Sequence, residues 1–171
     1  ALSLGAASDA EYVDFEMTEA LLPSLVMERL RKHLPRGAQI VRLKMLEGKH
    51  KALMADVDEA RYRITISYAG DLVRASVHRY NEAESAVWER VTPKKNRVIE
   101  TKAYIKTPVS FRLENGRLTF WMNLVVTPQG SVKPIEILSL MARDFDLPVD
   151  PNEAYVTRIG LFADDAALID R

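Results

Sequence analysis

Positively charged residues cluster in one stretch of the sequence, where they could bind an anion. The stretch TPKKNRVIETKAYI, residues 92–105, holds Lys94, Lys95, Arg97 and Lys102 in a pattern typical of an extended strand. Cationic side chains gathered on one surface attract phosphate groups. They also have a structural use, because long cationic side chains keep an exposed edge strand from pairing with other chains. Both interpretations of the stretch remain open at the level of sequence.

The charge balance of the chain makes this basic stretch stand out. The chain has 24 basic and 24 acidic residues and therefore no net charge. Residues 93–117 nevertheless contain seven lysines and arginines against two glutamates. One basic segment is therefore set into a neutral to acidic body.

Aromatic residues close to the basic segment could add stacking surfaces for nucleic-acid bases. Trp121 interrupts an apolar strand and is predicted on the face opposite Phe120 and Met122. Together with Trp88 and Tyr104 it could stack on bases held by the cationic side chains. The same residues would fit equally well as buried aromatic side chains of a two-faced sheet.

Other residue patterns restrict the chemistry that these 171 residues can perform. The chain has no cysteine, which excludes disulfides, thiolate zinc sites and thiolate-held iron–sulfur clusters. Its three histidines have no metal-ligand spacing, and no glycine-rich phosphate loop is present. Asp14, Glu16 and Glu100 leave a carboxylate-based enzyme as a minor alternative. We therefore expect no cofactor and no catalytic residues.

Lys133 is a further candidate for anion binding. It precedes Pro134 at the start of a predicted helix, where a cation and free backbone amides could bind an anion together.

Hydrophobic periodicity predicts an α+β fold with mostly antiparallel sheets. The Asn115-Gly116 pair between alternating segments is a strong hairpin signal, and Ser131 is the expected N-cap of the last helix. Strands are predicted at residues 12–17, 39–46, 62–68, 85–91, 97–105, 109–113, 117–127 and 154–162, and helices at 22–34, 71–80 and 132–145.

The order of these elements suggests two ferredoxin-like, or split βαβ, halves. Residues 61–171 would form one half with inserted strands and a hairpin. Residues 1–47 would form an incomplete half of order strand–strand–helix–strand, lacking its opening strand and helix. Residues 48–60 would be the hinge between them.

The chain resembles the DUF2344 family, a domain of unknown function found in radical-SAM-linked proteins. Glu100 stands where the family pattern suggests aspartate, and Lys133 where it suggests arginine. The substitution at Lys133 would lose bidentate anion recognition. The matching segments, in chain order, are GAASDAEYVDFEMTE, KKNRVIETKAYI, GSVKPIEIL and VTRIGLF, the last with Arg158 as a further candidate anion-binding residue.

The resemblance implies a function that composition does not. Members are encoded beside, or fused to, a cobalamin-binding-type radical SAM protein, often near genes for RNA processing, and begin upstream with a strand and a helix. A radical SAM enzyme holds its iron–sulfur cluster with three cysteine thiolates, and this chain has no cysteine. We therefore expect a non-catalytic accessory domain that binds the radical SAM partner, its substrate or both, with RNA as one candidate substrate. The alternative is a protein–protein interaction module that docks by a sheet edge. We expect a cytoplasmic location, no membrane span and an oligomeric state that the sequence leaves open.

Overall fold

A computed structural model shows an α+β protein that divides into two compact units. The structure describes residues 2, 5–46, 48, 51–93, 95–128 and 130–168. The large unit comprises Ala1–Glu11 and Val57–Arg171, and the small unit comprises Tyr12–Asp56. The division after Asp56 falls inside the predicted hinge, whereas the pairing of the first residues with the second part of the chain was not predicted. Among the described residues, no helix is long and apolar enough to cross a bilayer.

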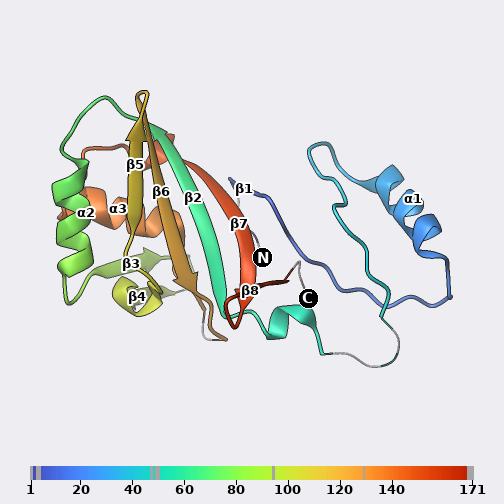
Figure 1. The fold of residues 1–171 in the computed structure, drawn as a ribbon. Helices are drawn as coiled ribbons and strands as arrows, with labels where there is room; N and C mark the ends of the chain where they lie inside the picture. Colours follow the sequence, from blue (N-terminus) through green and yellow to red (C-terminus); the bar gives the residue numbers. More distant parts are fainter. Residues whose placement is uncertain are drawn as a thin grey trace. The chain divides into compact units, whose positions relative to one another are not determined.

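The large unit is built around a mostly antiparallel sheet (Figure 1). Its strand order is β1-β7-β2-β6-β5, and β8 pairs with β7. Only β1 and β7 pair in parallel among the described strands. The predicted α+β class with mostly antiparallel strands is confirmed. The strands are β1 (Ala6–Ser8), β2 (Glu59–Ser67), β5 (Ser110–Glu114), β6 (Arg117–Val125), β7 (Tyr155–Ala163) and β8 (Ala166–Ala167).

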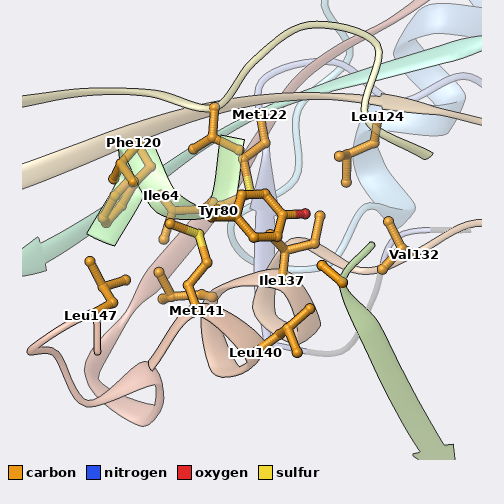
Figure 2. Close-up of a cluster of buried hydrophobic side chains, with 14 of the residues drawn as sticks. Ile64, Tyr80, Phe120, Met122, Leu124, Val132, Ile137, Leu140, Met141 and Leu147 are labelled. Carbon is orange, nitrogen blue, oxygen red and sulfur yellow. The ribbon is translucent and has the colours of Figure 1, made fainter. Parts of the chain in front are cut away.

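Two helices cover one face of this sheet, α2 (Val73–Glu82) and α3 (Pro134–Asp144) (Figure 1). Side chains alternate along a strand, so every second residue of β2 and β6 points toward the helices. Figure 2 shows their meeting point, with the ring of Tyr80 in the middle of the apolar cluster. Buried cluster residues include Ile64, Phe120, Met122, Leu124, Ile137, Leu140 and Met141. The alternate residues of the same strands lie on the opposite face, away from α2 and α3.

The fully buried Tyr80 predicts a loss of stability at alkaline pH. Burial raises the pKa of Tyr80 from its ordinary value of 10.0 to about 12. The folded state thus holds the proton more tightly than the unfolded state. The resulting stability is complete below pH 10 and is lost as the pH rises to about 12. In urea titrations across this window, we expect the free energy of unfolding to fall less in Tyr80→Phe than in the wild type. An equal fall in both proteins would contradict this role.

The chain segment that follows α2 and precedes β5 forms a separate two-stranded sheet. Its strands are β3 (Val87–Val91) and β4 (Asn96–Glu100). The sequence predicted a strand through residue 105, but the strand ends at Glu100 and a 3₁₀ turn covers Thr101–Tyr104. The carboxylate of Glu100 accepts hydrogen bonds from the backbone amides of Ala86 and Lys102. These local bonds turn the chain out of the strand direction, so the prediction was wrong after residue 100.

The Asn115-Gly116 hairpin is confirmed between β5 and β6. Both residues have positive φ angles, 51° for Asn115 and 73° for Gly116, as a tight two-residue turn requires. The start of α3 differs from its prediction, because Lys133 rather than Ser131 is the N-cap. The carboxylate of Glu136 accepts a hydrogen bond from the Lys133 amide at 2.8 Å.

The small unit contains one α-helix, α1 (Pro23–His33), as predicted, and a 3₁₀ turn at Leu53–Ala55. The strands predicted at residues 12–17 and 39–46 are absent from the part of this unit that the structure describes. Alternating apolar residues form a strand only when a neighbouring strand satisfies the backbone. Neither segment has such a neighbour here, so these two predictions were wrong.

Candidate functional site

The basic segment does not form one surface among its described residues. Lys94 lies outside the described residues, and Lys95 is exposed in the β3–β4 turn. The guanidinium of Arg97 donates to the Tyr104 hydroxyl at 3.3 Å. The Lys102 amine donates to the carbonyls of Tyr80 and Asn81 at 2.9 and 2.8 Å, and burial lowers its pKa. Lys102 therefore caps the C-terminal end of α2 rather than facing an open groove.

Two further candidate residues, Lys133 and Arg158, are each beside a carboxylate of the chain itself. The exposed Lys133 begins α3, where Glu136 already accepts from its backbone amide. Glu136 also receives two hydrogen bonds of 2.6 Å from Arg90. Arg158 is only 5% exposed and donates two hydrogen bonds, of 2.7 and 2.6 Å, to Glu11. An anion at either place would compete with a carboxylate that is already bound.

A different basic surface forms on the sheet face opposite α2 and α3. Alternation and strand register gather its side chains from four strands. The aromatic Trp121 is on this face, opposite Phe120 and Met122 as predicted. We call this surface the arginine face, and its members are Arg61, Arg63, Arg112, Arg117, Trp121 and Tyr155.

The outer part of the arginine face is accessible and only weakly neutralised. Arg112 is 70% exposed, and its nearest carboxylate, Glu114, is 3.8 Å away and also exposed. Arg63 lies 3.7 Å from the exposed Asp9. Exposed ion pairs of this length contribute at most about 1 kcal/mol, so a phosphate can displace them. A shallow depression of about 310 Å³ is lined here by Arg112, Glu114, Asn115, Arg117 and Thr119.

The inner end of the arginine face is fixed by a buried carboxylate. The fully buried carboxylate of Glu59 accepts a hydrogen bond from Arg61. It also forms an ion pair with the amine of Lys106 at 2.7 Å. Burial alone would raise the pKa of Glu59, but the bonds from Arg61 and Lys106 outweigh it and lower the pKa. The Arg61 guanidinium also lies 3.8 Å from the ring centre of Phe162. These contacts hold Arg61 in one position at the end of the face.

The other aromatic residues of the sequence hypothesis lie elsewhere. Trp88 and Tyr104 pack against the hydrophobic core, and Arg143 stacks over the ring of Trp88 at 5.3 Å. Among the predicted site residues that the structure describes, only Trp121 belongs to the arginine face. The four arginines and Tyr155 were missed, although strand alternation placed each of them opposite the core once the strand partners were known.

Two of the carboxylates considered for an enzyme, Asp14 and Glu100, each bind a different part of the described structure. Asp14 accepts a hydrogen bond from the Leu53 amide at 2.7 Å, while Glu100 is bonded to Ser85 and to backbone amides. No group of three or more histidine and carboxylate side chains in the described ranges could hold a metal ion.

Comparison with known proteins gives one match. A family model described as an uncharacterised protein conserved in bacteria, DUF2344, matches residues 1–134. The search of curated proteins and the search of solved structures found no match. The matched residues include β2, β5 and β6, and so every arginine of the arginine face.

Proposed function

Since the chain belongs to the DUF2344 family, we propose that it is a non-catalytic accessory domain of a radical SAM enzyme and binds that enzyme's RNA substrate on the arginine face. The radical SAM partner follows from the sequence resemblance. The RNA-binding role is supported by one structural observation, the collection of four arginines and two aromatic side chains on the sheet face opposite α2 and α3. This surface replaces the basic strand as the proposed contact.

The proposed fold of the large unit is ferredoxin-like with an inserted β3–β4 hairpin. Its elements follow the order β2, α2, β5, β6, α3 and β7, and the strands lie in the order β7-β2-β6-β5. Two interleaved split βαβ units have this order. The proposal does not extend to the small unit, because its described residues form no strand.

A salt titration of RNA binding tests the proposed function. The full chain is titrated into a fluorescently labelled twelve-residue oligouridine at several salt concentrations. Each neutralised phosphate on a single strand contributes a slope of about −0.7 to log K against log salt. If Arg63, Arg112 and Arg117 each meet a phosphate while Arg61 stays bonded to Glu59, we expect a slope of about −2. No binding, or binding that salt does not change, would remove RNA from the proposed function.

A further inference from the structure

We infer that the RNA held on the arginine face is single-stranded and that two of its bases stack on Trp121 and Tyr155. This inference rests on the proposed function and specifies its substrate.

Both aromatic side chains lie outside the hydrophobic core. Among the described residues, the core cluster and the hydrophobic residues packed against it include Trp88 and Tyr104 but neither Trp121 nor Tyr155. Tyr155 is 59% exposed at the start of β7, and Trp121 is half-buried in the middle of β6. A large ring left on a polar face offers an apolar surface to a ligand.

Polar and cationic side chains surround the two rings. Trp121 pairs across the sheet with Arg63 on one side and Ser110 on the other. Tyr155 pairs with Thr65, which in turn pairs with Thr119. An aromatic ring beside arginines is the combination found where proteins bind single-stranded nucleic acids, since the ring contacts a base and the cations contact phosphates.

The distance between the two rings favours an RNA strand without base pairs. Trp121 is on β6 and Tyr155 is on β7, with β2 between them. Their partners on β2 are Arg63 and Thr65, so the two rings are also offset by two residues along the strand direction. With about 4.8 Å between strands and about 3.4 Å per residue, their Cα atoms are about 12 Å apart. In an RNA duplex each base is already stacked on its neighbours and paired with the opposite strand. Bases can reach both rings only when the strand is unpaired and extended, which is how proteins commonly read RNA.

Binding of two matched RNA probes tests this inference. The full chain is titrated with labelled twelve-residue oligouridine and with a twelve-base-pair RNA duplex. We expect tighter binding to the single strand. In the variant Trp121→Ala with Tyr155→Ala, single-strand affinity should fall by about 5- to 150-fold for each lost stacking contact. Duplex affinity and the salt slope should not change, because no charge is removed.

Conservative variants separate stacking from folding. Trp121→Phe and Tyr155→Phe keep a ring and should retain most of the single-strand affinity. Oligouridine should also quench wild-type tryptophan fluorescence, and Trp121→Phe should abolish this quenching while Trp88 remains. Salt-dependent binding that is equal for duplex and single strand, or unchanged in the double alanine variant, would overturn the inference and leave the proposed function standing. Failure of both probes to bind would overturn the proposed function itself.

Discussion

Replacing Glu11 by alanine is expected to lower the free energy of unfolding by about 3–5 kcal/mol, the usual effect of leaving a buried charge without its partner. Arg158 is 5% exposed, and its guanidinium donates two hydrogen bonds to the Glu11 carboxylate. Without Glu11, a buried guanidinium loses its counter-charge. The same pair holds the first residues on β7, where the Asp9 amide donates to the Arg158 carbonyl at 2.9 Å.

Urea denaturation of Glu11→Ala and Arg158→Met measures this effect. Arg158→Met removes the buried charge together with its bonds, and the half-exposed Glu11 can then be hydrated. We therefore expect Arg158→Met to be clearly less destabilising than Glu11→Ala. Equal small effects from both substitutions would show that the Arg158 guanidinium is not buried. Loss of RNA binding in a fully folded Arg158→Met protein would instead return Arg158 to the binding site.

Reversing two charges of the arginine face, Arg112→Glu with Arg117→Glu, is expected to weaken oligouridine binding by at least about 30-fold. Two unit charges at 4 Å interact by about 1 kcal/mol even in water, and two lost contacts correspond to about 30-fold in affinity. Both side chains are exposed, so the fold should tolerate the change. The slope of log K against log salt should become less steep by about 1.4, that is 0.7 for each phosphate no longer neutralised.

Lys95→Glu is the matched control for the charge reversal. Lys95 is exposed in the β3–β4 turn, outside the arginine face. We expect this variant to bind oligouridine with an affinity close to that of the wild type. If Lys95→Glu weakens binding more than the double reversal does, the basic segment rather than the arginine face contacts RNA.

Local sequence patterns were enough to predict most of the large unit. The Asn115-Gly116 turn and the alternation of β2 and β6 are short-range signals that fix backbone geometry by themselves. The same kind of alternation failed at residues 12–17 and 39–46. A strand depends on a partner that the pattern cannot reveal, and no described strand pairs with these segments.

The candidate site could be predicted only in part, because it depends on contacts distant in sequence. Trp121 was placed on the correct face by alternation alone. Arg63 and Arg112 come together because β2 and β5 both pair with β6, an order that the alternation within each strand does not reveal. Arg158 looked like a surface cation, yet its partner Glu11 is 147 positions away.

The most direct test of the arginine face is an NMR titration of the isotopically labelled full chain with twelve-residue oligouridine. We predict that the largest amide shifts fall on β2, β5 and β6, at Arg63, Arg112 and Thr119, together with the indole signal of Trp121. Shifts confined to the basic segment, from Lys95 to Lys102, or confined to the small unit would contradict the account.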